Sequence, residues 1–231
     1  MTLHLSTHHL KIDFVSDVAC PWCAVGLNGL ELALRSTADV IDAEIAFQPF
    51  ELNPAMPAPG VNHNQHLAAV YGAGPEQLAS SQELLCGRAA SVGMTLNFTD
   101  QSRIYNTFDA HRLLHWAGTL NGGPARQRDL KRALFKANFT DNLNISDSAV
   151  LVGIAASVGL DADAAREVLT SLRYSAEVRQ AEALWQSRGI QAVPAIIINM
   201  KWLTSGGQPP EYYEEVLRRI GRELDAPEQA G

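Results

Sequence analysis

The chain has 231 residues, of which 46% are hydrophobic and 19% are charged, a balance typical of a globular protein with a sizeable core. Its 18 lysines and arginines against 25 acidic residues give a net charge of −7, which argues against nucleic acid or an anionic membrane as a partner. No run approaches the roughly 18 apolar residues that a membrane-spanning helix needs.

Compartment and redox state are indicated by the N-terminus and the cysteines. Residues Met1 to His9 lack the long apolar segment of a signal peptide. Cys20 and Cys23 stand together and leave Cys86 unpaired, so the three cysteines form no disulfide framework. We therefore expect a cytoplasmic protein.

The first elements predict a βαβ unit. Residues 12–16 read as a strand, and an apolar-rich helix begins at Pro21, a position where proline loses no backbone hydrogen bond. Gly26 and Gly29 weaken this helix and indicate that another backbone approaches it closely. The alternating segment 42–52 predicts a second strand, parallel to the first.

A long helical segment follows a proline-rich linker over residues 53–60. From about residue 62 to residue 172 the apolar positions recur with a helical period. Helices are expected over 75–92, 105–120, 124–139, 146–158 and 161–172. Ser146 and Asp161 are the expected N-caps. No fixed repeat is present, so we expect a helical insertion and not a solenoid.

The C-terminal part returns to the sheet. A helix is expected over 175–188, followed by a β-hairpin of 193–199 with 201–204 and a final amphipathic helix. The chain is therefore expected to be an α/β protein with two domains. Residues 10–60 and 174–226 would form one domain, and residues 61–173 the all-helical insertion.

The chemistry is indicated by Cys20-Pro21-Trp22-Cys23 at the first strand-to-helix junction. Two cysteines on a first helical turn can close a small disulfide ring, and a helix N-terminus favours a thiolate. This pattern predicts a redox site. The alternative, a zinc site, lacks a second cysteine pair, and we expect no metal. A Cys₂His₂ site would have to recruit from His63, His66, His111 or His115.

Two distant motifs together resemble the thioredoxin superfamily: the CPWC sequence at residues 20–23, and Val193-Pro194 ahead of a hairpin and a final helix. The helical segment between them resembles the DsbA branch, which implies a thioredoxin fold (βαβ plus β-hairpin–helix) interrupted by a large helical insertion. Four stretches look more closely like the FrnE-like oxidoreductases, which are cytoplasmic DsbA-like proteins. These stretches are Ser16 to Cys23, Pro49 to Pro54, Ala110 to Leu114 and Gly206 to Gln208.

The dithiol and the distant proline are expected to carry the reaction. Cys20 would be the exposed nucleophile and Cys23 the shielded resolving thiol of an exchange through a mixed disulfide. The resemblance implies that Pro194 is the superfamily's cis-proline and faces the dithiol. The Val193 backbone would then pair with an extended substrate. The alternative is that Pro194 merely begins a strand.

Substrate contacts are expected from Trp22, Val193, Phe50 and His111. Asp17 and Glu51 lie at strand ends near the dithiol, and either is a candidate to relay the Cys23 proton. A capping or solvated carboxylate is the alternative for both. Cys86 is expected to be a small core residue.

The expected activity is that of a protein-disulfide or dithiol oxidoreductase acting on a protein or small-molecule disulfide. No cofactor is expected, with glutathione as a candidate co-substrate and a homodimer as a candidate assembly. One rival is a glutathione-dependent isomerase or transferase, related to 2-hydroxychromene-2-carboxylate isomerase and kappa-class glutathione transferase. Those relatives typically carry serine where this chain has Cys20. A second rival is a non-catalytic holdase. The direction of exchange is left open.

Overall fold

The computed structural model describes residues 7–57 and 59–226, so most of the stretch that carries the signal-peptide expectation lies outside the described residues. Its main sheet has the strand order β2-β1-β5-β6. The strands are β1 (His8–Ser16), β2 (Ile41–Pro49), β5 (Ala195–Ile198) and β6 (Trp202–Ser205). β1 and β2 are parallel, as predicted, whereas β5 is antiparallel to both β1 and β6.

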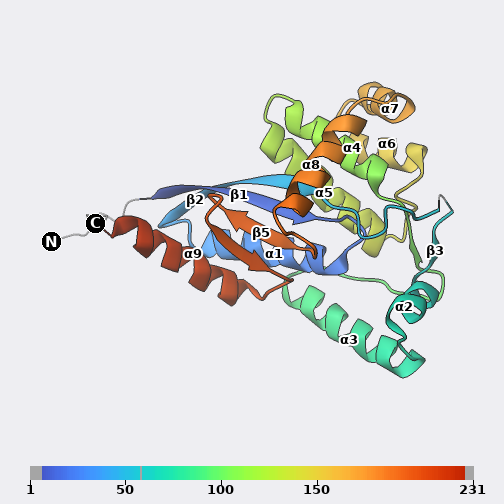
Figure 1. The fold of residues 1–231 in the computed structure, drawn as a ribbon, viewed down its shortest axis with the longest axis horizontal. Coiled ribbons are helices and arrows are strands. Elements are labelled where there is room, and N and C mark those ends of the chain that lie inside the picture. Colours follow the sequence, from blue (N-terminus) through green and yellow to red (C-terminus); the bar gives the residue numbers. More distant parts are fainter. Residues whose placement is uncertain (1–6, 58, 227–231) are drawn as a thin grey trace.

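The connection between β1 and β2 is helix α1 (Pro21–Ser36), which begins at the predicted proline. The chain between β2 and β5 is mostly helical (Figure 1). It contains α2 (His63–Tyr71), α3 (Pro75–Ser91), α4 (Phe108–Thr119), α5 (Gly123–Phe139), α6 (Ser148–Ser157), α7 (Ala162–Thr170) and α8 (Ser175–Ser187). Helix α9 (Pro210–Asp225) follows the β5–β6 hairpin. The expected thioredoxin fold with a helical insertion is confirmed.

The inserted segment differs from the prediction in two respects. No separate helix was expected where α2 lies, and β3 (Val61–Asn62) and β4 (Arg103–Ile104) form a two-stranded antiparallel sheet. Two residues are too few to show the alternation that marks a strand. The expected boundaries near residues 60 and 173 fall just before β3 and between α7 and α8. The division into two domains stays a prediction. Within the described residues, no helix combines the length and the apolar character that a bilayer-spanning segment requires.

The main sheet is covered on both faces, with α1 and α9 on one side and α8 on the other (Figure 1). Ile12, Phe14 and Ile196 are buried on the α1 side. Val15, one residue along, packs with Trp185 of α8 on the opposite face. Each large apolar side chain buried in this way contributes roughly 1.5–3 kcal/mol. Both faces of the sheet are therefore needed for stability.

The inserted helices have a core of their own, in which Leu113, Leu134, Leu151 and Val168 are buried. Val18, from the turn between β1 and α1, is fully buried in this same core. The turn that leads into α1 is consequently anchored in the helical segment as well as in the sheet.

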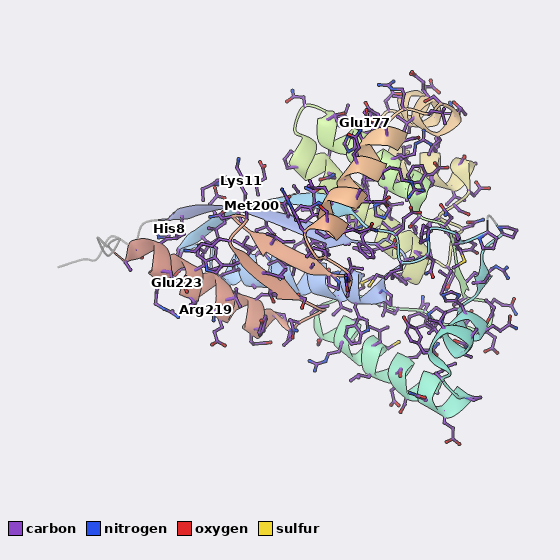
Figure 2. The ribbon with its side chains drawn as sticks, in the orientation of Figure 1. His8, Lys11, Glu177, Met200, Arg219 and Glu223 are labelled. Atoms are coloured by element: carbon purple, nitrogen blue, oxygen red, sulfur yellow. The ribbon has the colours of Figure 1, made fainter. Side chains whose placement is uncertain are left out.

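The end of the sheet away from the cysteines has polar contacts that join β1 and β6 to the C-terminal helix. His8 lies 3.0 Å from the Asp225 carboxylate, and Trp202 donates a hydrogen bond of 3.1 Å to Glu223. Figure 2 shows His8, Arg219 and Glu223 at this end, far from Glu177 on α8 beside the inserted helices. Because α1 begins where β1 ends, the cysteine motif lies at the other end of β1, towards the insertion.

Helix ends follow the predicted capping residues with one shift. Asp161 caps α7 by accepting a hydrogen bond of 2.8 Å from the Ala164 amide, as predicted. At α6 the cap is Asp147 and not Ser146, whose hydroxyl bonds to Asn144. Either side chain is a good cap, so composition alone does not choose between neighbours.

The prediction of a close approach to α1 is confirmed. A Cβ at Gly26 would lie 3.2 Å from the Pro194 ring, and one at Gly29 would lie 2.9 Å from the carbonyl oxygen of Gln208. The helix that carries the cysteines is therefore pressed against the segments around Pro194 and Gln208.

We predict that Gly29→Ala destabilises the protein by about 1–3 kcal/mol, because the added methyl group overlaps a backbone oxygen that cannot move aside cheaply. Gly153→Ala is the matched control: it is an exposed helical glycine with nothing within 4 Å of an added Cβ. That control should gain roughly 0.5–1 kcal/mol from helix propensity. Urea unfolding of both variants measures the difference, and equal shifts would contradict the close approach.

Candidate active site

The two cysteines occupy the start of α1. Cys20 is the N-cap, and its amide donates a hydrogen bond of 3.1 Å to the Asp17 carbonyl oxygen. The Cys23 amide donates to the Cys20 carbonyl oxygen at 3.0 Å, which places Cys23 on the first helical turn. Both are free thiols.

The burial of the cysteines corrects one prediction. Cys23 is fully buried, as expected, but Cys20 is only 4% exposed, so it is not the exposed nucleophile that its position predicted. Burial, followed by the hydrogen bond and the charge interaction with Cys20, raises the pKa of the Cys23 thiol well above its ordinary value. Cys23 therefore stays protonated at neutral pH unless a base removes its proton.

The segment that faces the dithiol comes from just before β5. The Cys20 thiol donates a hydrogen bond of 3.7 Å to the Val193 carbonyl oxygen, and the Val193–Pro194 peptide bond is cis. The Pro194 carbonyl oxygen in turn accepts a hydrogen bond of 2.9 Å from the Gly206 amide. The contact between Cys20 and Val193 brings together two motifs that are about 170 residues apart in the chain.

Trp22 lies beside this segment. A Cβ at Gly207 would be 2.8 Å from the Trp22 carbonyl oxygen, so the tryptophan packs directly on the Gly206–Gly207 turn. Trp22 and Val193 are half-buried, so both retain some surface beside the dithiol. These two are the residues expected to contact substrate that keep solvent access.

Phe50 and His111 do not line an open groove. Phe50 is 7% exposed and packs with Val15 and Trp185 between the sheet and α8. His111 is 2% exposed and faces inward from α4. Their sequence positions could not distinguish a groove wall from a buried side chain, because burial here depends on the packing of α4 and α8 over the end of the sheet.

The His111 ring faces the carboxylate of Asp17. Nε2 lies 3.5 Å from Asp17 Oδ1, a separation typical of an ion pair, and both side chains are almost completely buried. The Asp17 carboxylate also accepts hydrogen bonds from the Leu52 amide at 2.7 Å and the Ala19 amide at 3.1 Å. Burial alone would raise the pKa of Asp17, but His111 and the two amides outweigh it and lower the pKa below its ordinary value. The surroundings of Asp17 therefore stabilise its charged form.

Lys131 of α5 is a residue that the sequence analysis missed. Its side chain is fully buried, and its ammonium group has no hydrogen-bond partner in the part of the chain that the structure describes. Burial lowers the pKa of Lys131 to about 8, although the charges of Cys23, Asp17 and Cys20 act in the opposite direction. A signal was present: Lys131 stands next to Leu130 on the apolar stripe of α5, where a charged residue is out of pattern.

Glu51 is directed towards α8. Its carboxylate accepts a hydrogen bond from Arg179, which also bonds to Glu182 at 2.8 Å and stacks on the Phe108 ring at 3.8 Å. Burial raises the pKa of Glu51, and Arg179 opposes the increase. The role of Glu51 in relaying the Cys23 proton stays a prediction, and the same holds for Asp17.

The remaining thiol and the histidine pairs lie apart from this chemistry. Cys86 is half-buried against the α1 core, and its thiol donates a hydrogen bond of 3.7 Å to the Leu96 carbonyl oxygen. His63 packs on Phe98, and His115 on Tyr174. Over residues 7–57 and 59–226, no cluster of three or more histidine, cysteine, aspartate or glutamate side chains is arranged to hold a metal ion.

This geometry agrees with the comparisons with known proteins. A family model described as a DSBA-like thioredoxin domain matches residues 11–218. The chain belongs to the DsbA-like thioredoxin domain family. It is 30% identical to YwbO of Bacillus subtilis over 193 residues, which covers 83% of this chain and 87% of that one.

Solved structures of DsbA-like proteins have the same fold. A probable DsbA oxidoreductase from Streptomyces coelicolor superposes with a TM-score of 0.84 at 31% identity, covering 96% of this chain and 94% of that one. A 2-hydroxychromene-2-carboxylate isomerase (TM-score 0.69, 15% identity, 93% and 98% covered) shares the fold. So does the cytosolic disulfide reductase DsbM of Pseudomonas aeruginosa, in a structure with glutathione (TM-score 0.60, 16% identity, 92% and 99% covered).

Within this DsbA-like chain, the stretches that carried the family resemblance meet at the dithiol. Asp17 precedes the cysteines, Leu52 belongs to the stretch after β2, and His111 to the stretch on α4. The fourth stretch supplies the Gly206–Gly207 turn against Trp22. The motifs are therefore parts of one structural unit.

We predict that Asp17→Asn lowers the free energy of unfolding at pH 7 by about 1–3 kcal/mol, because a charged acceptor of two amides is lost. Since the folded pKa of Asp17 is below its unfolded value, this stability is present above pH ~4 and is lost as the pH falls through the folded pKa. The difference between the wild type and the variant should therefore shrink in acid.

Urea unfolding between pH 7 and pH 3 provides the test. Asp163→Asn is the control, because the Asp163 carboxylate is 92% exposed and should have little effect at any pH. A constant difference between wild type and Asp17→Asn over this range would contradict the assignment of a charged Asp17.

Proposed function

We propose that this DsbA-like protein is a thiol–disulfide oxidoreductase in which Cys20 and Cys23 alternate between a dithiol and a disulfide. The observation that supports this most directly is the placement of two reduced thiols on one helical turn, with the Cys20 sulfur against the Val193 carbonyl oxygen. A helix N-terminus favours a thiolate at its first residues, which suits Cys20 as the nucleophile.

In the proposed cycle the Cys20 thiolate attacks one sulfur of a substrate disulfide and releases the other as a thiolate. The resulting mixed disulfide is broken when Cys23 loses its proton and attacks the Cys20 sulfur. The Cys20–Cys23 disulfide forms, and the substrate leaves as a thiolate that takes up a proton from water. The substrate is reduced by two electrons and the protein is oxidised by two; the reverse sequence oxidises a substrate dithiol.

The proposed substrate site is the surface beside Cys20. The Val193 carbonyl oxygen, now occupied by the Cys20 thiol, would accept a hydrogen bond from an extended peptide segment or from the amide of a small thiol. Trp22 and Pro194 would flank it. We propose a protein or small-molecule disulfide as the substrate, acted on in the cytoplasm, with glutathione as co-substrate. The similarity to DsbM, a cytosolic disulfide reductase with glutathione in its structure, supports this choice. A homodimer stays a proposal from family resemblance.

The second candidate is a glutathione-dependent isomerase, since a 2-hydroxychromene-2-carboxylate isomerase has the same fold. An isomerase does not need a resolving thiol. Here Cys23 is fully buried and interacts with the Cys20 thiol, an arrangement that favours disulfide cycling. We therefore rank the oxidoreductase first.

We predict that Cys20→Ser abolishes the reduction of insulin or glutathione disulfide, whereas Cys23→Ser accumulates a mixed disulfide at Cys20 and loses at least ~100-fold in turnover. Cys86→Ser is the control and should keep full activity, because Cys86 lies on α3 outside the proposed site. Turnover assays and mass spectrometry of the trapped adduct measure these outcomes. An active Cys23→Ser enzyme would support the isomerase instead.

A further inference from the structure

Lys131 is the buried group that the proposed cycle has not used. A lysine with no exposed surface, and with no hydrogen-bond partner for its ammonium group among the described residues, is costly to fold, because the charge loses its hydration. Its nearest aromatic neighbour, the Phe135 ring, is 4.9 Å from the nitrogen and offers only a weak contact. An apolar residue would suit this position on the stripe of α5 better, so stability does not explain the lysine.

The ionisable groups that act on Lys131 are the two cysteines and Asp17. The ionised form of Cys23 would affect it most strongly, followed by Asp17 from the preceding turn and then by Cys20. Helix α6, which also packs on α5, has no titratable residue, and β2 contributes only uncharged side chains near Lys131. The thiolate of Cys23, formed when that thiol gives up its proton, is thus the group whose charge would act most strongly on the lysine.

A small cavity lies beside Lys131, between α5, α4 and β2. It has a volume of about 30 Å³ and is lined by Lys131 together with Gln48, His111, His115 and neighbouring apolar residues. Roughly 10–15 Å³ suffices for one water molecule, and a polar lining of this kind favours one. Gln48 and His115 are only half-buried, so the cavity leads from the lysine towards the surface.

We propose that Lys131 is the acid–base group that exchanges a proton with Cys23 during the resolving step, and that this proton passes between Lys131 and solvent through the cavity on the α4 side. In the resolving direction the neutral amine takes the proton from the Cys23 thiol and becomes an ammonium ion. The Cys23 thiolate then attacks the Cys20 sulfur, and the substrate thiolate leaves. In the reverse direction the ammonium ion returns the proton to Cys23 as its disulfide opens.

Two properties of the site fit this role. Cys23 is a thiol whose pKa is raised, so it needs a base within the protein. With a pKa of about 8, Lys131 is neutral in a useful fraction of molecules near pH 7, whereas an ordinary lysine is almost never neutral there. The inference rests on the proposed function, because it assigns a step in the disulfide cycle.

The test is the rate of the resolving step in Lys131→Met. Reduced protein is mixed with glutathione disulfide, quenched with acid at short times, and analysed by mass spectrometry for the mixed disulfide and the Cys20–Cys23 disulfide. We expect the mixed disulfide to persist, with resolution about 100-fold slower at pH 7, the lower end for loss of a positioned acid–base group. The variant's rate should keep rising with pH beyond the point where the wild-type rate levels off.

Stability separates this role from a structural one. Because methionine replaces an unpaired buried charge, the melting temperature of Lys131→Met should be equal to or higher than that of the wild type. Arg128→Met is the matched control: it removes a positive charge from an exposed position of α5 and should leave resolution unchanged. Unchanged resolution and an unchanged pH profile in a folded Lys131→Met variant would overturn the proposal.

A measurement on the wild type makes the test independent of whether the variant folds. The ¹³Cε chemical shift of Lys131 reports its charge, and it should titrate well below the exposed lysines and differ between the reduced and oxidised proteins. An ordinary lysine titration in both states would overturn the proposal. If the wild type formed no Cys20–Cys23 disulfide, the proposed function itself would fail; normal cycling by Lys131→Met would remove only the role of Lys131.

Discussion

The position of the dithiol depends on one buried carboxylate, that of Asp17. It accepts amide hydrogen bonds from Ala19 in its own turn and from Leu52 beyond β2, and it faces His111 on α4. A carboxylate is stable in a protein interior only with such partners. Because these partners belong to the turn, the sheet edge and the insertion, the start of α1 is fixed only when all three are folded. The helical segment is therefore part of the active-site scaffold.

Lys131 is the opposite case, a buried charge that has no hydrogen-bond partner within residues 7–57 and 59–226. The partners of Asp17 stabilise its charged form and lower its pKa, whereas burial lowers the pKa of Lys131 and favours its neutral form. The two groups lie on different elements, Asp17 in the turn before α1 and Lys131 on α5, and the charge of Asp17 acts on Lys131. In the proposed cycle, the unpaired charge that destabilises the fold is that of Lys131, the group that exchanges a proton with Cys23.

Much of the fold could be predicted because its signals are local. Pro21 indicated the start of α1, and Gly26 and Gly29 indicated a close approach that the structure provides through Pro194 and Gln208. The strands β3 and β4 were missed because two residues are too few to show an alternating pattern. The N-cap of α6 lies one residue from the predicted position because adjacent side chains can both cap a helix. Local patterns predicted the structure correctly where only one residue type suits the position, as with proline at a helix start or glycine at a close approach.

The sequence by itself determined the redox motif and the strand–helix junction that carries it, because both follow from residue type and spacing along a short stretch. The fold class came from the resemblance of two distant motifs, at residues 20–23 and 193–194, to the thioredoxin superfamily. Only the tertiary structure decided which side chains meet. It buried Cys20, turned His111 inward to Asp17, and buried Lys131 of α5 where the charge of Cys23 can act on it. Burial and charge pairing depend on how distant elements pack, and no local pattern specifies that packing.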